Sequence, residues 1–503
     1  MASETAISRD PALSPAALEA LGLELSELRE DLQVAEGQVA GVLAAVHPDN
    51  ARSARNLVHY LALRRHDLRR LQLRLARAGL SSLGRSEPHV LITLDRIRML
   101  IALARGTTPA TVEDPPVGFR QGERILSANA RRLLGPPRSN RRVRVIVTLP
   151  TEAATDAQLV NELVRAGMDC ARINCARDDA DIWAAMADNV RAAGRLHGRG
   201  CRILADLGGP KLRTGPIAGG AHRLLLTNGD LFEVVLGQNA PLRQGARPCI
   251  ACATEEVFRH VAVGHPIWFD DGSIGGVVEE CAPERILVRV VSAKRQGSKL
   301  RPGRGINLPS TPLHRPAVTS KDLLDLAHAV QWADAIELSF VEQPGDVLAL
   351  HDALRHHDAD SMGVVLKIET RLGFANLPQL LLTAMQRRSC GVMIARGDLA
   401  VEVGFERMAE IQEEILWIAE AAHVPTIWAT QVLDELASEG KLSRAEMTDA
   451  AMSARAEAVM LNKGPYVIDA IAALDDILGR MKHHHAKKRS LYRALHVSHS
   501  LWP

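Results

Sequence analysis

The sequence lacks long apolar runs, a secretory leader and a paired cysteine pattern. None of its 503 residues lies in an apolar stretch of about 18 residues, the length that a membrane-spanning helix needs. Glu4, Asp10 and Glu19 interrupt the start of the chain, where a signal peptide would have an apolar core. Seven scattered cysteines, an odd number, are typical of a reducing compartment. We therefore expect a cytoplasmic protein that does not enter a membrane.

The chain also lacks a dominant charge. It has 61 basic and 59 acidic residues, a formal net charge of +2, so no general attraction to nucleic acid is expected. Cys249 and Cys252 form a single C-x-x-C without a second pair, which is weak evidence for a zinc or redox site. The remaining classes are those of a large globular protein with sizeable apolar cores, because 47% of the residues are hydrophobic.

The first part of the chain is predicted to be helical. Within residues 15–105, leucines recur at roughly helical spacing between residues 57 and 75, and six arginines lie between residues 64 and 77. We interpret these arginines as a solvated helix face; a polyanion-binding face is the alternative. Residues 106–118 have the composition of a linker, and 119–135 form one more candidate helix.

From residue 142 the pattern changes to short β-rich runs that alternate with helical stretches. The ends of the runs from the second onward are marked by Asn174, Asp206, Ser339, Lys367, Asp398, Thr430 and Asn462. Successive markers lie 28 to 32 residues apart, with one exception. A strand, a helix and two loops take roughly thirty residues, so eight such units favour a closed (β/α)8 barrel over an open sheet. The eight runs are residues 143–149, 168–174, 202–207, 334–340, 362–369, 391–396, 424–430 and 457–462.

One interval is about a hundred residues too long. Asp206 and Ser339 are 133 residues apart, and the excess, residues 216–308, contains short β-rich runs split by Gly and Asn turns. We expect a small β domain inserted after the third barrel strand. An insert at that end of a barrel lies above the active site, where it can act as a lid.

Charged residues stand where these apolar runs end. Lys367 and Glu369 close one run, Asp398 closes the next, and Arg172 lies near the end of the second. A strand buried on both faces should stay apolar, so charge at its end is how a barrel builds an active site. Hard carboxylate oxygens beside cations indicate a divalent metal and an anionic substrate, a combination suited to phosphoryl transfer.

Over residues 142–480 the chain resembles pyruvate kinases. The segments that carry the resemblance are Ala-Arg-Ile-Asn (171–174), Asp-Leu-Gly-Gly-Pro-Lys-Leu-Arg-Thr-Gly (206–215), Phe-Asp-Asp-Gly (269–272), Gly-Ile-Asn-Leu-Pro (305–309), Leu-Lys-Ile-Glu (366–369), Ile-Ala-Arg-Gly-Asp-Leu (394–399), Ala-Thr-Gln (429–431) and Ser-Arg-Ala-Glu (443–446). Members of this family transfer the phosphoryl group of phosphoenolpyruvate to ADP, and the enolpyruvate is then protonated.

The resemblance implies roles for particular residues. Lys367 and Arg172 match groups that hold the transferring phosphoryl group, and Thr430 matches a residue near the site of protonation. Glu369 and Asp398 match the ligands of Mg2+ or Mn2+. The other implied positions are substrate-binding Gly397, Asp398, Thr430 and Ser339, and nucleotide-binding Asn174, Arg213 and Arg304.

The chain departs from the family at a monovalent-cation position. Lys211 stands where potassium-requiring members carry glutamate, and Ala176 replaces a serine whose hydroxyl would ligate the ion. A tethered ammonium can replace bound K+ as a fixed positive charge. We therefore expect an enzyme that does not require K+, although a lysine on a solvated loop is the alternative.

Strand eight departs more seriously. Asn462 and the residues after it replace the family's Ser-Gly-Glu-Thr, whose serine and glutamate belong to the network that protonates the enolate. An asparagine can form hydrogen bonds but cannot act as an acid near neutral pH. The strand-one loop, Thr148 to Thr151, also differs. The family's C-terminal effector domain is expected to be absent, and the N-terminal helices lie outside the resemblance.

The sequence therefore predicts an Mg2+-dependent, pyruvate kinase-like enzyme that forms ATP from phosphoenolpyruvate and ADP. Two alternatives stay open: an Mg2+-dependent lyase or decarboxylase of an oxo-acid, and a non-catalytic sensor of phosphoenolpyruvate or nucleotide. A homo-oligomer is expected, with a dimer favoured. The expected domains are residues 1–140 (helices and linker), 141–215 with 309–480 (catalytic barrel), 216–308 (lid) and 481–503 (basic tail).

Overall fold

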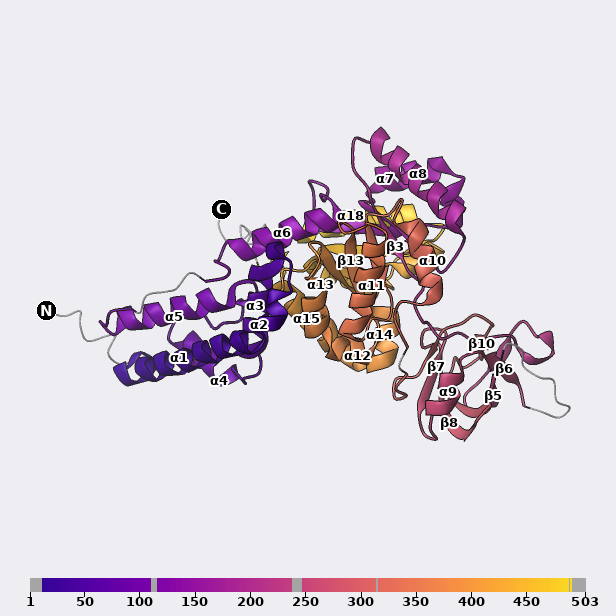
Figure 1. Cartoon of the computed structure of the whole chain (residues 1–503), viewed down its shortest axis with the longest axis horizontal. Helices are drawn as coiled ribbons and strands as arrows, with labels where there is room; N and C mark the ends of the chain where they lie inside the picture. The colour runs from indigo at the N-terminus through magenta and orange to yellow at the C-terminus, as the bar shows by residue number, and fades with distance from the viewer. Residues whose placement is uncertain (1–10, 110–114, 238–246, 314, 488, 491–503) are drawn as a thin grey trace, which may run out of the picture.

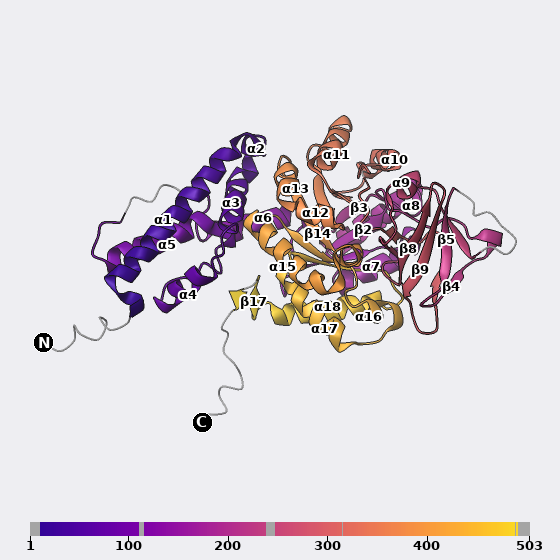
Figure 2. The same cartoon turned by 90° about the horizontal axis from the view of Figure 1, so that it is seen from below.

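The structure is a computed structural model that describes residues 11–109, 115–237, 247–313, 315–487 and 489–490. Three parts follow one another along its long axis: a helical part, a central barrel and a β domain (Figures 1 and 2). The helical part and the β domain lie at opposite ends of the barrel. The barrel therefore contacts the helical part on one side and the β domain on another.

The central part is a closed barrel of eight parallel strands, which confirms the predicted (β/α)8 fold. Its order around the ring is β1-β16-β15-β14-β13-β12-β3-β2, so each strand neighbours the next barrel strand in the sequence. The strands are β1 (Arg144–Thr148), β2 (Cys170–Asn174), β3 (Arg202–Asp206), β12 (Ala335–Leu338), β13 (Gly363–Ile368), β14 (Cys390–Ala395), β15 (Thr426–Ala429) and β16 (Ala458–Leu461).

Helices surround the barrel and bury the outer face of its strands. Every residue of β13 and β14 is buried, as expected for parallel strands covered on both faces. Polar side chains fix several helix starts: Asp156 caps α7, and Thr319 forms a capping box with Asp322 at α10. The helices are α7 (Ala157–Ala166), α8 (Ala180–Leu196), α10 (Ser320–Ala329), α11 (Pro344–His356), α12 (Arg371–Ala375), α13 (Leu377–Ala384), α14 (Arg396–Val403), α15 (Phe405–Ala421), α16 (Asp434–Glu439), α17 (Arg444–Met452) and α18 (Val467–Met481).

Helix α6 (Gln121–Leu134) closes the end of the barrel at which the strands begin. Its last two residues, Leu133 and Leu134, join the apolar cluster of the barrel interior. Glycine is required at two strand starts beside it, because a Cβ on Gly363 or Gly391 would lie 2.5 Å from a methyl carbon of Leu133. The helix is therefore the floor of the barrel, and only the opposite rim is available for a site.

The N-terminal helices form a bundle that docks on α15, as Figure 2 shows. Buried polar side chains connect the two parts: Asn56 Nδ2 donates to the carbonyl of Ala421 at 2.8 Å, and the His423 ring bonds Ser53 Oγ and the Pro88 carbonyl, both at 2.9 Å. The helices are α1 (Pro15–Gln38), α2 (Ala40–Ala44), α3 (Ala51–Leu63), α4 (Arg69–Arg77) and α5 (Val90–Ala104).

A β domain is inserted between β3 and β12. Its main sheet has the order β11-β7-β8-β9-β5-β6, beside a two-stranded sheet of β10 and β4, and it has an apolar core of its own. Its elements are β4 (Leu224–Leu226), β5 (Leu231–Leu236), β6 (Cys249–Cys252), α9 (Glu255–His260), β7 (Pro266–Phe269), β8 (Ile274–Ala282), β9 (Arg285–Ser292), β10 (Ser298–Leu300) and β11 (Ile306–Asn307). Short 3-10 helices and the strands β17 (His485–Ala486) and β18 (Arg489–Ser490) complete the described structure, while most of the predicted basic tail lies outside the described residues.

Candidate active site

Charged and polar side chains gather at the rim where the barrel strands end. Asp206 ends β3, Ser339 follows β12, and Lys367 and Glu369 lie at the end of β13. Lys367 is 7% exposed and Glu369 is 3% exposed, so these charges lie in the protein and not in solvent. A buried charge is stable only with partners, and each of these has them.

Lys367 is the centre of this cluster. Its ammonium lies 2.8 Å from Asp206 Oδ1, 2.7 Å from Ser339 Oγ and 3.3 Å from Glu369 Oε1. Burial opposes the charged amine, but the Asp206 and Glu369 carboxylates outweigh burial and raise the pKa of Lys367 above its ordinary value. The lysine therefore carries a positive charge at neutral pH inside a buried site.

Arg172, from β2, is held on three sides. Its Nε lies 2.8 Å from Glu337 Oε2, its Nη1 donates to Thr148 Oγ1 at 3.1 Å, and its Nη2 donates to Asp206. Glu337, which was not among the residues predicted from the sequence, is fully buried within β12. A single acid in an otherwise apolar, buried strand needs a cationic partner, so its position in the sequence could have identified Glu337 as a site residue.

The cluster contains more acids than cations. Arg172 and Lys367 face three carboxylates, those of Asp206, Glu337 and Glu369. Burial raises the pKa of Glu337 and of Glu369, whereas Arg172 and Lys367 overcome burial and lower the pKa of Asp206. Glu337 Oε1 is buried without a hydrogen-bond partner among the described residues. The site is therefore suited to a further cation.

Gly397 and Thr430 meet at the ends of β14 and β15. The Gly397 N–H donates to Thr430 Oγ1 at 2.7 Å, and Thr430 has a left-handed backbone, with φ of 62°. Arg396 supports them, because its Nη2 donates to the Thr430 carbonyl at 2.6 Å and its Nη1 to Asp449 at 2.5 Å. Helix α14 begins at Arg396, so Gly397 lies in its first turn.

Asp398 connects the barrel to the inserted domain. Lys211, in the segment that leads into that domain, lies 2.9 Å from Asp398 and 3.1 Å from Asp271. Asn307 Nδ2 also donates to Asp398 Oδ1, at 3.3 Å. Burial opposes the Lys211 ammonium, but Asp398 and Asp271 outweigh it and raise its pKa. Lys211 is therefore a fixed positive charge at the junction of the two parts.

The three residues expected at the nucleotide lie farther along the same edge. Asn174 is the last residue of β2, Arg213 Nη1 donates to the Gly303 carbonyl at 3.2 Å, and Arg304 lies 3.2 Å from Asp270. The two arginines belong to the outgoing and returning segments of the inserted domain. They would move with that domain, unlike the Lys367 cluster, which the barrel fixes.

Strand eight places a different side chain at the rim. Asn462 follows β16, and its Nδ2 donates to Asp434 Oδ1 at 3.1 Å, at the start of α16. The amide is thus held by a carboxylate of the neighbouring strand's loop. Asn462 cannot take over the acid role of the family's serine and glutamate, because an amide does not titrate.

The donor set at the rim fits one divalent cation. Glu369 and Asp398 supply hard carboxylate oxygens. Burial raises the pKa of Glu369, and repulsion from the Asp398 carboxylate adds to this effect. Such a shift is expected where two acids approach each other without a metal ion. Mg2+ often binds one or two carboxylates and takes its remaining ligands from substrate oxygens and water. The described residues contain no cluster of three or more His, Cys, Asp or Glu side chains arranged for a metal.

The described part of the chain contains no helix with the length and apolar character needed to cross a lipid bilayer. The seven cysteines form no disulfide among the described residues, and Cys281 alone among them is exposed. The C-x-x-C pair at Cys249 and Cys252 is buried in β6.

A (β/α)8 barrel with a β domain inserted after its third strand, and with acidic and basic groups at the carboxyl rim, defines a class of barrel enzymes with an inserted domain. The family model described as "Pyruvate kinase, barrel domain" matches residues 140–471. The chain belongs to the pyruvate kinase family.

Curated pyruvate kinases are similar over the same region. That of Mycobacterium tuberculosis is 31% identical over 349 residues, which cover 67% of this chain and 70% of the relative. The enzyme of Bacillus licheniformis is 29% identical over 348 residues, or 68% of this chain and 57% of the relative. Pyruvate kinase PKLR of Rattus norvegicus is 31% identical over 350 residues, or 67% and 59%. The chain therefore spans little more than half the length of some relatives.

Proposed function

We propose that this protein transfers the phosphoryl group of phosphoenolpyruvate to ADP, forming pyruvate and ATP. The observation that supports this most directly is the convergence of Lys367 and Glu369, from one strand, with Asp398 and Thr430 from the next two strands at one rim. The family's barrel domain covers the same residues. In phosphoryl transfer the protein mainly positions the reactants and neutralises charge, and this rim offers groups for both.

In this proposal Lys367 and Arg172 bind the phosphoryl oxygens. Asp206 and Glu337 hold both cations in place, so neither side chain has to become ordered when the substrate binds. Gly397 and Ser339 border the carboxylate of the substrate. Thr430 Oγ1 already accepts a hydrogen bond from the Gly397 N–H, so its own proton is available toward the enolate.

Glu369 and Asp398 would hold Mg2+ or Mn2+. When bound, the ion would neutralise charge on the reacting oxygens. Asn174, Arg213 and Arg304 would contact the phosphates of ADP or ATP. The proposal assigns catalysis to residues 141–215 and 309–480 and closure over the substrate to residues 216–308.

We further propose that Lys211 makes the reaction independent of K+. Lys211 is anchored by Asp271 and Asp398, so it provides a positive charge beside the candidate metal ligand without a bound monovalent ion. Rates measured in chloride salts of Na+, K+ and tetramethylammonium at equal ionic strength should agree within about twofold. A large activation by K+ alone would refute this role of Lys211.

The central test is one assay of pyruvate and ATP formation. We expect Lys367→Met to reduce turnover by at least a thousandfold, because the buried positive charge is lost, and EDTA to abolish activity. Lys441→Met is the matched control, since Lys441 is exposed and pairs with Glu439 on the surface. A Lys367→Met protein that remains folded and fully active would overturn the assignment.

An oxo-acid lyase or decarboxylase is the second candidate, favoured by one observation. Asn462 replaces the acid network of strand eight and is bound to Asp434, so protonation of the enolate is the least supported step. Release of pyruvate from oxaloacetate without nucleotide, together with no ATP formed from phosphoenolpyruvate, would favour this candidate over the kinase.

Two coarser proposals accompany the activity, a compartment and an oligomeric state, and a non-catalytic sensor remains the alternative to it. Seven cysteines scattered along the chain, an odd number, agree with a reducing compartment such as the cytoplasm. A homo-oligomer, with a dimer favoured, is testable by light scattering. A non-catalytic sensor would show thermal shifts with phosphoenolpyruvate or nucleotide but no turnover.

A further inference from the structure

The returning part of the inserted domain carries an excess of positive charge. Residues 285–313 contain seven basic residues and no acidic residue. Arg285, Arg289 and Arg304 form ion pairs with acidic side chains of the same domain. The other four are exposed and form no ion pair within the described part of the chain: Lys294, Arg295, Lys299 and Arg301. Their charges are therefore not compensated by the protein.

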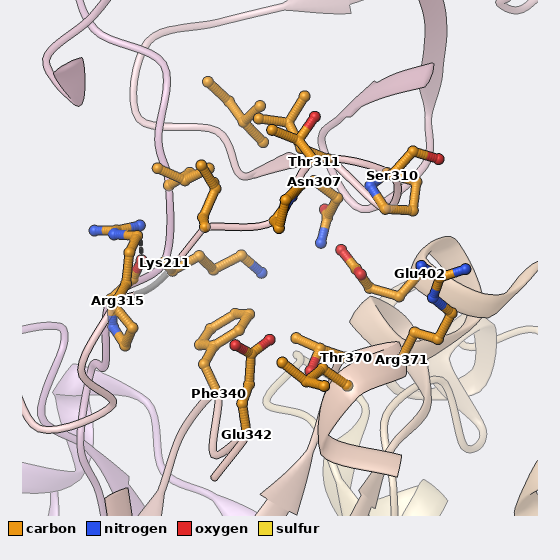
Figure 3. Close-up of a pocket in the computed structure, with 18 of the residues that line it drawn as sticks. Lys211, Asn307, Ser310, Thr311, Arg315, Phe340, Glu342, Thr370, Arg371 and Glu402 are labelled. Atoms are coloured by element: carbon orange, nitrogen blue, oxygen red, sulfur yellow. Dashed lines mark hydrogen bonds between the residues drawn. The ribbon is translucent and has the colours of Figure 1, made fainter. Parts of the chain in front are cut away.

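Two cations nearer the rim differ in this respect. Lys211 contacts Asp271 and Asp398. Arg315 donates to the Pro210 carbonyl beside a cavity of about 530 Å³, and Figure 3 shows both cations on the wall of this cavity. Groups of the protein thus hold Lys211 and Arg315, unlike the four exposed cations.

Two of the four exposed cations lie on one face of a two-stranded ribbon. Strand β10 pairs antiparallel with β4, and Lys299 lies opposite Leu225. Both residues are exposed, whereas the residues on either side of Lys299 are buried, so Lys299 and Arg301 lie on the outer face. The same register, continued by one residue, places the exposed Arg223 opposite Arg301. Arg223, Lys299 and Arg301 thus form one cationic face.

The cationic face is electrostatically unfavourable without an anion. Like charges directly opposite each other on neighbouring strands destabilise a sheet, and Arg223 and Arg301 are such a pair. Lys299 adds a third charge, about 7 Å along the strand from Arg301. An anion that neutralises all three charges at once relieves this repulsion, so the face favours a ligand with several negative groups in a row.

The cationic face adjoins the two arginines proposed to contact nucleotide phosphates. Thr214 connects the two segments of the inserted domain here: its Oγ1 donates to the Arg301 carbonyl and its N–H to the Arg304 carbonyl, both at 2.8 Å. Arg213 forms a β-bridge with Gly305. One short, hydrogen-bonded crossing therefore brings Arg213, Arg301 and Arg304 together.

We infer that the cationic face binds a linear chain of condensed phosphates, and that the near end of this chain reaches Arg213 and Arg304. Arginine is suited to this ligand, because its guanidinium group binds phosphate oxygens through two N–H groups at once. Single-stranded nucleic acid fits less well, since sites for it combine cations with aromatic side chains on which bases stack. Residues 285–313 contain no aromatic residue.

The first test is titration calorimetry of the full chain in buffer without Mg2+, with short-chain inorganic polyphosphate as the probe. Orthophosphate at the same total phosphate concentration is the counter-probe. We expect polyphosphate to bind at least tenfold more tightly for each phosphate unit, because one chain contacts several cations. Equal binding of orthophosphate would overturn the inference. Poly(U) that binds as tightly as polyphosphate would also overturn it and would assign the surface to nucleic acid.

A double variant places the binding on the cationic face. Arg223→Gln with Arg301→Gln removes two exposed charges and should weaken polyphosphate binding at least tenfold. The logarithm of the affinity should also depend less steeply on the logarithm of the salt concentration, since fewer counterions are released. Arg259→Gln is the matched control, because Arg259 is an exposed arginine of the same domain that pairs with Glu255 within α9. If the double variant binds as the unmodified protein does, the cationic face is not the site.

The overlap with ADP rests on the proposed function and has its own test. Because the chain reaches Arg213 and Arg304, a fixed concentration of polyphosphate should weaken ADP binding at least tenfold in the unmodified protein and much less in the double variant. If ADP binds equally with and without polyphosphate, the overlap is refuted while the proposed function stands. If ADP does not bind at all, the proposed function fails, and the direct titration of polyphosphate still decides the cationic face.

Discussion

Glu337 is the residue on which the geometry of Arg172 depends. It lies inside β12, is fully buried, and meets Arg172 Nε at 2.8 Å. The carboxylate compensates the arginine, and the arginine compensates the carboxylate, so neither is stable alone in this interior. The pair therefore connects stability to the proposed function. The contact with Glu337 stabilises the buried charge of Arg172 and also orients its guanidinium group toward the rim.

Replacing Glu337 separates these roles. We expect Glu337→Ala to lower the free energy of unfolding by about 3–5 kcal/mol, because it leaves a buried arginine with one carboxylate fewer and opens a cavity. Glu337→Gln keeps the volume and should cost less, while KM for phosphoenolpyruvate rises as Arg172 loses its fixed orientation. Urea denaturation and steady-state kinetics measure the two effects. Unchanged stability in Glu337→Ala would contradict the pairing.

At the scale of elements, the contact between the helical part and the barrel depends on buried polar groups. His423, after α15, is fully buried and bonds Ser53 Oγ and the Pro88 carbonyl. Burial lowers the pKa of His423 to about 4, and nearby His89 acts in the same direction. The ring is therefore neutral in the folded protein at pH values where a free histidine is already charged.

This shift predicts an acid-sensitive contact. A histidine whose pKa falls from 6.5 to about 4 on folding contributes stability above pH 6.5 that is lost as the pH falls toward 4, at most about 3 kcal/mol. Hydrogen exchange in α3 should accelerate over this range, and His423→Gln should weaken the dependence. His351→Gln is the control: its pKa is also lowered to about 4, but it lies on α11, so α3 should respond as in the unmodified protein.

The elements that the sequence predicts well are those with a local signal. The eight barrel strands are short apolar runs at regular intervals, and Lys367, Glu369 and Asp398 stand out because charge interrupts apolar sequence at their ends. The role of α6 has no such signal. Its leucines indicate a helix, but only the three-dimensional structure shows that Leu133 meets Gly363 and Gly391 beneath the barrel.

Long-range pairs are likewise invisible in the sequence. Asn307 and Asp398 are 91 residues apart, and Asn56 and Ala421 are 365 apart, so no periodic pattern relates them. Lys211 could be assigned a role from its place in a motif, but its two carboxylate partners come from separate parts of the chain. The sequence therefore predicts which groups reach the rim better than how they are paired there.

At the scale of the whole molecule, the loop after β7 is a further place, beside Asp398, where the inserted domain contacts the barrel. Gly272, in this loop, has φ of +85°, and a Cβ there would lie 3.0 Å from Val401 Cγ2 and 3.3 Å from the Phe405 ring. Gly229, in the same domain, has φ of +93° and nothing within 4 Å of a Cβ. Both glycines therefore have a positive φ, which other residues rarely adopt, but only Gly272 contacts the barrel.

This difference predicts how closure of the inserted domain responds to a single methyl group. Both Gly272→Ala and Gly229→Ala carry a backbone penalty of roughly 1 kcal/mol, but only Gly272→Ala also crowds α14. We expect Gly272→Ala to push the domain away, to raise KM for phosphoenolpyruvate several-fold, and to speed tryptic cleavage within residues 207–215, where Lys211 and Arg213 lie. Gly229→Ala should leave both unchanged. Equal effects of the two variants would show that this contact does not position the domain over the rim.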